Sequence, residues 1–247
     1  WEESWEARSE LWLVRLLADQ VVFLTHAMVA QYPPVIRNPV VVYNFSPLAP
    51  VRQPPENPRP RLVMAAQMVM AKGIDVFLEV CHRLQERAVP FDAWMVGGWL
   101  EEATRAEAER FIRQHHLEAV VTICGVLPQM EPVYARMDVL LLPTQRDSFP
   151  RVVMEAMCHS IPVVATRVDG IPEMVEDGVT GLLVAPGDVV GFTAATEKLL
   201  CDPALRTRLG TAGRRRAEQL FTPAKYVEAM AQIYAGLGPA AQPKGMP

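Results

Sequence analysis

From Arg61 onward, the sequence alternates between short apolar runs and segments with the apolar spacing of an α-helix. Six runs have the length of strands, at 61–66, 91–97, 119–123, 138–142, 162–166 and 181–184. Helix-like segments lie between most of them, at 74–88, 101–116, 129–136, 150–159 and 171–176. Such alternation indicates βαβ units, and runs that are apolar throughout are typical of strands buried on both faces. The sequence therefore predicts an α/β fold with a doubly wound parallel sheet.

The two ends of the chain have a different character. Residues 1–31 are predicted to form an amphipathic helix, a short strand at 21–25 and a second short helix, and 40–43 a further strand. Nine prolines fall between positions 33 and 60, too many for a helix or a central strand, so a stiff linker is predicted over 46–60. After the last strand, three helices are predicted at about 188–201, 203–219 and 223–236, followed by a disordered tail over 238–247.

Composition excludes several classes of protein. Half of the 247 residues are hydrophobic, enough to bury a core, which rules out a mainly disordered chain. A formal charge of −4 argues against a protein that grips a nucleic acid, and the arginines at 206, 208 and 214–216 are interpreted as a solvated helix face. No apolar run approaches the roughly 18 residues of a membrane span.

Cysteine and histidine spacing predicts neither disulfides nor a metal site. The four cysteines are scattered without a C-x-x-C pair, which favours reduced thiols in a cytoplasmic protein. The five histidines lack ligand spacing with carboxylates or cysteines. The start of the chain does not have the pattern of a signal peptide. Because the chain begins at Trp1 rather than Met, we expect it to be a piece of a longer protein, trimmed or natural.

Ligands of an open parallel sheet bind beyond the carboxyl ends of its strands, so the loops that follow the strands are the candidate sites. In the segment 143–157, Asp147 lies in such a loop and Glu155 lies about one and a half turns into the next helix, which begins near Phe149 or Pro150. The free N–H groups at this helix start favour an anion. The alternative is that Asp147 or the following serine is only an N-cap and Glu155 a solvated helix residue.

The second candidate loop lies at 65–75. A strand ends near Ala66, and Lys72-Gly73 opens the next helix. A lysine here can bring an ammonium group next to a phosphate. Alternatively, Lys72 is an ordinary surface lysine.

These loops belong to a longer series of short motifs. The series comprises Asn44, KGID at 72–75, VGG at 96–98, Gly125-Val126, DVLLLP at 138–143, DSFPRVVMEAM at 147–157, IPVVAT at 161–166, GIPE at 170–173 and DGVTG at 177–181. In this order and spacing, the motifs resemble the C-terminal half of the family 4 retaining glycosyltransferases, which have the GT-B architecture. The resemblance covers about 80% of the chain. It implies that the predicted sheet is Rossmann-like and is one half of a GT-B enzyme.

The resemblance implies donor chemistry in a domain spanning residues 61–222. The donor would be a nucleotide-diphosphate sugar, UDP- or GDP-linked, bound without a metal or other cofactor. Asp147 would contact hydroxyl groups of the sugar, and Glu155 would accept hydrogen bonds from the ribose. Lys72 would neutralise the leaving diphosphate. The other donor-binding residues implied are Gln67, Gly73, Gly97, Gly125, Val126, Leu127, Ser148, Phe149, Pro150, Arg151, Val152 and Val153. The reaction would be a front-face substitution with retention and without a protein nucleophile.

The sequence departs from the family pattern at several positions. Gln67 stands where an arginine is usual. The lost charge would cost about 2–4 kcal/mol of transition-state stabilisation, which Arg146 or Arg151 would have to supply instead. Ala66 replaces a glycine of the same loop, and the first carboxylate is an aspartate where glutamate is commonest. A serine at position 160 takes the place of a helix-ending glycine, which costs on the order of 1 kcal/mol.

Length is the largest departure, because a complete GT-B enzyme has two domains with the acceptor between them. Residues 1–45 would be a remnant of the acceptor domain, and 223–237 the helix that crosses back to it. We therefore expect an exposed apolar patch around residues 1–45 and 223–237 and an inactive isolated chain. The acceptor, whether saccharide, lipid or small molecule, and a peripheral membrane association of the parent protein stay open.

Two other functions were weighed. A nucleotide-sugar-binding module without catalysis is favoured by Gln67 and by the short length. An NAD-dependent oxidoreductase is disfavoured, because no G-x-G-x-x-G motif opens a helix.

Overall fold

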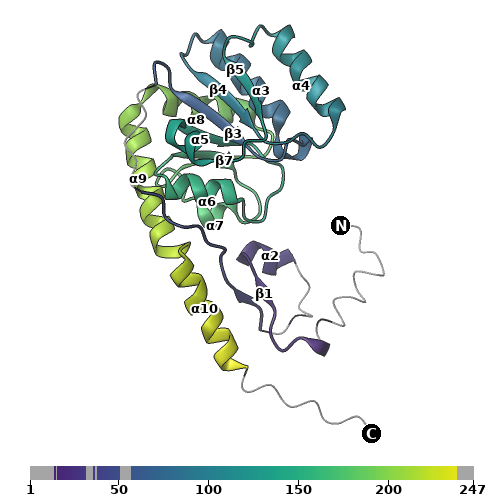
Figure 1. Ribbon diagram of the computed structural model, residues 1–247, viewed down its shortest axis with the longest axis vertical. Helices are drawn as coiled ribbons and strands as arrows, with labels where there is room; N and C mark the ends of the chain where they lie inside the picture. Colours follow the sequence, from purple (N-terminus) through teal and green to yellow (C-terminus); the bar gives the residue numbers. More distant parts are fainter. Residues whose placement is uncertain (1–13, 15, 32–35, 37, 51–56, 238–247) are drawn as a thin grey trace.

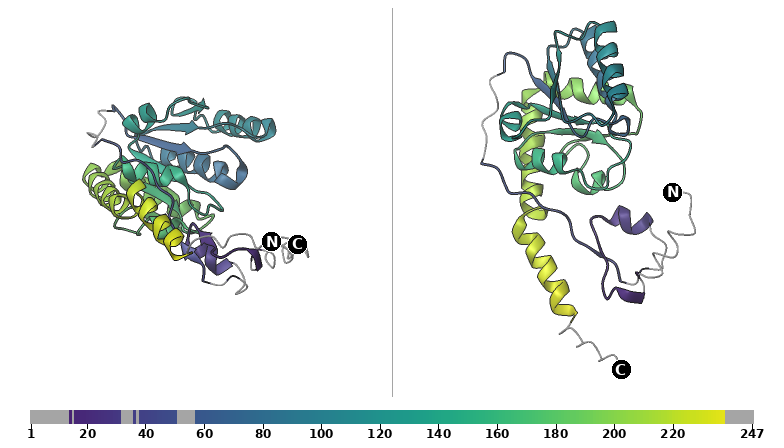
Figure 2. Two further views of the ribbon diagram at one scale, coloured as in Figure 1. Left: turned by 60° about the horizontal axis from the view of Figure 1, so that its bottom comes forward. Right: turned by 45° about the vertical axis from the view of Figure 1, so that its right-hand side comes forward.

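The computed structural model describes residues 14, 16–31, 36, 38–50 and 57–237. Its main body is a parallel sheet between two layers of helices (Figure 1). The last helix projects beyond the sheet, toward the end of the molecule where the small N-terminal elements lie (Figure 2). The helix predicted at the start of the chain falls largely outside the described residues, as do residues 51–56 of the predicted linker and the whole of the predicted tail.

All six strands of the sheet lie where the apolar runs predict them. They are β3 (Arg61–Ala65), β4 (Asp92–Val96), β5 (Val121–Gly125), β6 (Val139–Leu142), β7 (Val163–Thr166) and β8 (Leu182–Val184). Their order in the sheet is β5-β4-β3-β6-β7-β8, and every neighbouring pair is parallel. The chain thus starts in the middle of the sheet, builds outward to one edge and then returns to build the other. The point of reversal lies between β3 and β6, where the loops after the two strands separate and leave room for a ligand.

Alternate residues along each strand face opposite helix layers. One layer contains α3 (Ile74–Glu86), α4 (Glu102–Gln114) and α8 (Val189–Cys201), and the other contains α5 (Glu131–Arg136), α6 (Arg151–Cys158) and α7 (Ile171–Met174). In β3, Leu62 and Met64 pack in the first layer, whereas Val63 and Ala65 pack in the second. Helix α9 (Pro203–Leu220) contributes residues to both cores. The predicted α/β class and doubly wound parallel sheet are confirmed.

Three helices end in the same left-handed turn without a glycine. The residues after α3, α4 and α6 that adopt positive φ are Ala88 (54°), His116 (54°) and Ser160 (58°). In each turn the next residue donates its N–H to the carbonyl five residues back, as Ile161 does to Ala156 at 2.9 Å. This is the Schellman arrangement, in which glycine is the usual residue. The predicted left-handed conformation of Ser160 is confirmed.

The arginines of α9 correct one expectation. Arg206, Arg214 and Arg216 do not form a solvated face, because their guanidinium groups donate to backbone carbonyls at the ends of α8, α6 and α7, at 2.7–2.9 Å. These carbonyls lie in the last turns of their helices, where no N–H group of the same helix donates to them. The arginine side chains supply the missing donors. Arg208 and Arg215 are exposed, as predicted.

The N-terminal elements are shorter than predicted, and hydrogen bonds to the carboxylates of Glu173 and Asp169 tie them to the main body. They are β1 (Val22–Phe23), α2 (His26–Gln31) and β2 (Val40–Val41), with β1 and β2 parallel to each other. Glu173 of α7 accepts hydrogen bonds from the N–H groups of His26 (2.9 Å) and Ala27 (2.7 Å) and from the hydroxyl of Tyr43 (3.1 Å). A carboxylate at the start of a helix accepts hydrogen bonds from the free N–H groups there and interacts favourably with the helix dipole.

Helix α10 (Pro223–Gly236) contains no buried residue. Val227 and Tyr234 of this helix and the following Leu237 are exposed, as are Val22 and Leu24 near the start of the chain. Apolar side chains are thus exposed in both terminal segments, and the expected patch stays a prediction. Within the part of the chain that the structure describes, no helix combines the length and apolarity needed to cross a membrane.

Candidate functional site

An open cleft of about 610 Å³ lies at the carboxyl ends of β3, β4 and β5. Its walls come from the loops after these strands, from α5 and from the first turns of α6. The lining residues are Ala65, Ala66, Gln67, Val96, Gly97, Gly98, Trp99, Val126, Leu127, Met130, Tyr134, Arg151, Val152 and Glu155. A cleft at this edge of a doubly wound sheet is where such folds bind their ligands.

Glycine is needed where the floor of the cleft is built. Gly97 has a φ of 144°, and a Cβ there would lie 1.7 Å from the carbonyl oxygen of Ala66. The ends of β3 and β4 therefore approach more closely than a side chain allows. The N–H of Gly97 also donates to the carbonyl of Gly125 at 2.8 Å, which joins the third strand end to the other two.

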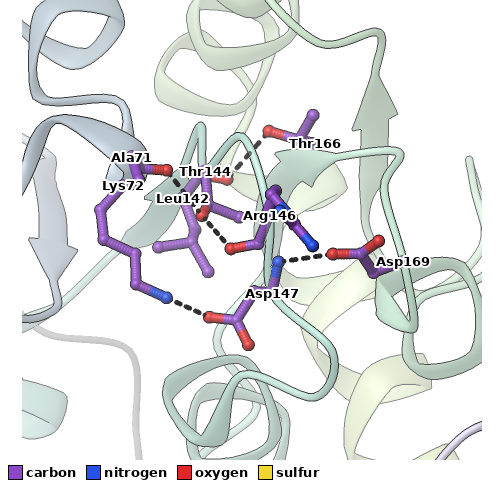
Figure 3. A network of polar contacts seen from close by, with 8 residues as sticks. All are labelled: Ala71, Lys72, Leu142, Thr144, Arg146, Asp147, Thr166 and Asp169. Carbon is purple, nitrogen blue, oxygen red and sulfur yellow. Dashed lines mark hydrogen bonds and ion pairs between the residues drawn. The ribbon is translucent and has the colours of Figure 1, made fainter. Parts of the chain in front are cut away.

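An ion pair between Lys72 and Asp147 spans the point of reversal of the sheet (Figure 3). Lys72 lies in the short 3-10 helix η1 (Met70–Lys72) after β3, and its Nζ is 2.5 Å from Oδ2 of Asp147, which follows β6. The two side chains are 25% and 18% exposed. Gly73, with φ of 78°, permits this approach, because a Cβ would lie 2.1 Å from the carbonyl oxygen of Pro143. Lys72 is therefore not an ordinary surface lysine.

The loop that carries Asp147 is fixed at several points. The buried hydroxyl of Thr144 lies 3.1 Å from the carbonyl of Ala71 and 2.9 Å from that of Arg146, and it donates to one of the two. On the other side, the N–H of Asp147 donates to Oδ2 of Asp169 at 2.9 Å (Figure 3). The backbone of Asp147 is thus held independently of its side chain, which points to Lys72.

Helix α6 begins one residue or two later than predicted. Its N-cap is Pro150, without a side-chain cap, so neither Asp147 nor Ser148 is the N-cap that the alternative interpretation required. The N–H groups of Arg151 and Val152 belong to the first turn and have no carbonyl within the helix to bind. Both residues line the cleft.

Glu155 lies in the second turn of α6 and is held by two donors. The hydroxyl of Tyr134 donates to its Oε2 at 2.5 Å, and the guanidinium of Arg151 donates to its Oε1 at 3.2 Å. The side chain of Glu155 is 23% exposed and lines the cleft, so it is not a solvated helix residue. Burial, together with the carboxylate of Glu155, raises the pKa of Tyr134 above its ordinary value.

The structure brings seven of the predicted site residues together in the cleft: Gln67, Gly97, Val126, Leu127, Arg151, Val152 and Glu155. Lys72, Gly73 and Asp147 form the neighbouring ion-pair site. Gly125 lies just behind the cleft and Ser148 just before α6. The side chains of Phe149, Pro150 and Val153 are buried away from the lining, so only their backbone is available to a ligand.

The sequence pattern did not indicate a role in the site for Trp99, Met130 and Tyr134, which line the cleft, or for Asp169, which holds the loop of Asp147. Trp99 directly follows the Gly97-Gly98 pair, and this position in the loop after a strand could have indicated a residue of the site. Tyr134 has the spacing of a core residue in a short helix and is in fact buried, so its polar contact was not visible in the pattern. Among the described residues, no group of three or more histidine, cysteine, aspartate or glutamate side chains is arranged to hold a metal ion.

Comparison with known proteins agrees with the fold and the motifs. The sequence model of the family described as "Glycosyl transferases group 1" matches residues 59–202, more than half of the chain. The chain belongs to this family. The matched range contains the cleft, the ion pair and all of the strands of the main sheet. The resemblance to glycosyltransferases is therefore confirmed, and the narrower assignment to family 4 stays a prediction.

Curated relatives of the chain are longer than the chain itself. The N-acetyl-alpha-D-glucosaminyl L-malate synthase of Bacillus anthracis is 32% identical over 125 residues, which are 51% of this chain and 33% of the relative. A GDP-mannose-dependent alpha-(1-6)-phosphatidylinositol monomannoside mannosyltransferase of Mycolicibacterium smegmatis is 32% identical over 169 residues, which are 64% of this chain and 43% of the relative. The chain thus spans less than half the length of these relatives.

Solved structures share the fold. HepE of Anabaena, crystallised with UDP and glucose, matches with a TM-score of 0.82 and 20% identity over 93% of this chain and 66% of its own. At this identity, the likeness concerns the fold alone. It agrees with the prediction that the sheet is of the GT-B type.

Proposed function

We propose that this glycosyltransferase binds a nucleoside-diphosphate sugar, UDP- or GDP-linked, in the cleft and transfers its sugar with retention. The observation that carries the proposal is that the cleft and the Lys72–Asp147 pair are both built from the segment that follows β3. A donor that binds along the first turn of α6 would extend from the cleft toward this cation and carboxylate. Two comparisons support the choice of donor, since HepE was solved with UDP and the Mycolicibacterium relative is GDP-mannose-dependent.

The donor would lie along the cleft with its base near Val126 and Leu127 and its ribose near Glu155. Its diphosphate would accept hydrogen bonds from the N–H groups at the start of α6, where the helix dipole favours negative charge. The sugar would reach Asp147, whose carboxylate accepts hydrogen bonds from its hydroxyl groups. No resident metal or cofactor forms part of the proposal.

The chemical step needs a group that stabilises the leaving diphosphate. As the bond from the sugar C1 to the phosphate oxygen breaks, negative charge develops on that oxygen, and the proton of the acceptor hydroxyl moves to it. The acceptor oxygen then bonds to C1 on the same face, which retains the configuration. Lys72 has three N–H donors, and within the described part of the chain its side-chain hydrogen bond is to Asp147, so its other donors can stabilise the developing charge.

The acceptor would be bound between this chain and the rest of a longer enzyme, and the isolated chain would be inactive. Residues 1–45 would belong to the acceptor side and α10 would cross back to it. The acceptor would be a saccharide, a lipid or a small molecule, not a nucleic acid, and a lipid acceptor would bring the parent protein to a membrane surface. Unpaired cysteines at 81, 124, 158 and 201 suit a reaction in the cytoplasm.

One observation favours a second candidate, a nucleotide-sugar-binding module without catalysis. Gln67 lines the cleft where the family pattern has an arginine. A neutral amide donates a hydrogen bond to a ground-state diphosphate, but it stabilises the extra charge of the transition state less well. Binding of the donor without release of its sugar would mark this case.

Calorimetric titration of the chain with UDP, GDP, UDP-glucose and GDP-mannose tests the proposal. We expect one diphosphate to bind, and both Lys72→Ala and Glu155→Ala to weaken its affinity by about tenfold or more, since a hydrogen bond with a charged partner contributes about 1.5–3 kcal/mol. Matched controls are Lys198→Ala and Glu118→Ala, which remove exposed side chains far from the cleft. A folded wild-type chain that binds none of the four would contradict the proposal.

A further inference from the structure

Tyr134 is a polar residue of the cleft that none of the recognised motifs contains. It lies on the short helix α5, between β5 and β6, and only 3% of it is exposed. Its hydroxyl is 2.5 Å from Oε2 of Glu155, which lies on a different helix. A buried aromatic ring thus carries its one polar atom to the carboxylate that faces the cleft.

The ring of Tyr134 is fixed by its neighbours. His159 stacks on it with a centroid separation of 4.4 Å and an interplanar angle of 24°. The Nδ1 of His159 lies 2.8 Å from the carbonyl oxygen of Glu155, and a carbonyl only accepts, so this nitrogen carries the proton. The histidine is therefore oriented by α6 and, in turn, orients the tyrosine ring. Because the ring has little freedom, its hydroxyl points to one place.

The two oxygens of Glu155 have unequal partners. Oε2 is bound by the buried hydroxyl of Tyr134, which stays protonated because its pKa is raised. Oε1 is bound by Arg151, whose side chain is 74% exposed and held by the 3.2 Å contact. An ion pair within one helix whose arginine is this exposed is weak, so a ligand can replace it. One oxygen is thus anchored and the other is available.

We infer that Tyr134 is a positioning residue, which holds the Glu155 carboxylate toward the cleft so that the ribose hydroxyls of the donor can donate to it. The inference rests on the proposed function, since it assigns the ribose to Glu155. It adds the residue that orients this carboxylate before the ligand arrives. An oriented acceptor binds more tightly, because less side-chain entropy is lost on binding.

A double-mutant cycle on the ligand tests this role. Tyr134→Phe removes only the hydroxyl. The affinity of this variant is measured for UDP or GDP, whichever the wild type binds, and for the 2′,3′-dideoxy form of the same diphosphate. We expect Tyr134→Phe to weaken the ribose-containing diphosphate about tenfold and to leave the dideoxy form unchanged. In a Glu155→Ala background, Tyr134→Phe should have no further effect. Tyr234→Phe, at an exposed tyrosine of α10, is the matched control.

Three outcomes would overturn the inference. Equal weakening of both ligands would mean that Tyr134 only supports the local structure. Unchanged affinity for the ribose-containing ligand would mean that Glu155 is oriented without it. In both cases wild-type binding and its loss in Glu155→Ala would stand, so the proposed function would survive. A folded wild-type chain that binds neither UDP nor GDP would remove the proposed function and the inference together.

Discussion

Gln67 lines the cleft at a position where the family pattern has an arginine. It is exposed and neutral, Lys72 is paired with Asp147, and Arg151 is paired with Glu155. Of the two arginines considered as replacements, Arg151 lines the cleft, whereas Arg146 is absent from its lining. Arg151 is also released from its carboxylate partner more readily than Lys72, because the side chain of Arg151 is 74% exposed and that of Lys72 is 25% exposed. Charge at position 67 is therefore expected to limit the affinity for a diphosphate.

Replacing Gln67 with arginine should raise this affinity. We expect Gln67→Arg to bind the preferred nucleoside diphosphate about tenfold more tightly, because a charged donor replaces a neutral one. Titration at two salt concentrations should also show a steeper loss of affinity with salt. Gln219→Arg adds the same charge at an exposed position of α9 and should change neither. Equal effects of the two substitutions would mean that only net charge matters.

The site could be predicted from the sequence where motif and loop coincide. Lys72 and Asp147 lie in the loops after β3 and β6, and Glu155 lies in the helix that follows the second of these loops; a parallel sheet brings such segments to one edge. Tyr134 and Asp169 were not found, because their partners are separated from them by 21 and 22 residues and depend on how α5 and the loop after β7 pack. Side-chain contacts of this kind require the assembled fold.

Among the elements, the strands were easier to predict than the ends of helices. Strands such as β6 and β7 are buried at every position, so their apolar runs stand out. The ends of α3 and α4 were placed two residues too late, because Ala88 and His116 do not look like helix stops. Their left-handed conformation is imposed by the Schellman hydrogen bonds and is not favoured by the residues themselves.

Glycine at these helix ends should therefore stabilise the protein. We expect Ala88→Gly to raise the free energy of unfolding by about 0.5–1 kcal/mol, because glycine adopts positive φ without a steric cost. Ser160→Gly should have a similar effect. The same change within a helix, Ala106→Gly in α4, should instead lower it by about 1 kcal/mol. Urea unfolding measures all three, and a loss of stability in Ala88→Gly would contradict the explanation.

At the scale of the whole molecule, Glu173 joins the N-terminal elements to the site. Its carboxylate binds the start of α2 and the hydroxyl of Tyr43. The ring of Tyr43 stacks on Phe149 at 5.6 Å and contacts Phe221 edge-on at 5.7 Å. Phe149 comes directly before the N-cap of α6, so the segment before the linker contacts the loop that leads into this helix.

Removal of this carboxylate should release the N-terminal elements selectively. In Glu173→Ala, the amides of His26 and Ala27 lose their acceptors, at a cost of about 1–3 kcal/mol for groups left unsatisfied. We expect faster hydrogen exchange over residues 25–31 and unchanged exchange in β3 and β6. Glu176→Ala, which removes only an exposed carboxylate 3.9 Å from Arg216, should change neither. Faster exchange throughout the sheet would contradict a local role.

The position of β3 also has a consequence for how the chain acquires its site. β3 comes first among the six strands in sequence, yet it lies in the centre, where β4 covers one side and β6 the other. While the chain is being made, β3, β4 and β5 can pair as soon as they emerge, but the far edge of β3 stays bare until β6 follows. An unpaired apolar edge can pair with another chain, so this interval is when aggregation competes with folding. Lys72 meets Asp147 only when β6 has paired with that edge of β3. The ion pair therefore forms only in molecules in which this pairing is complete.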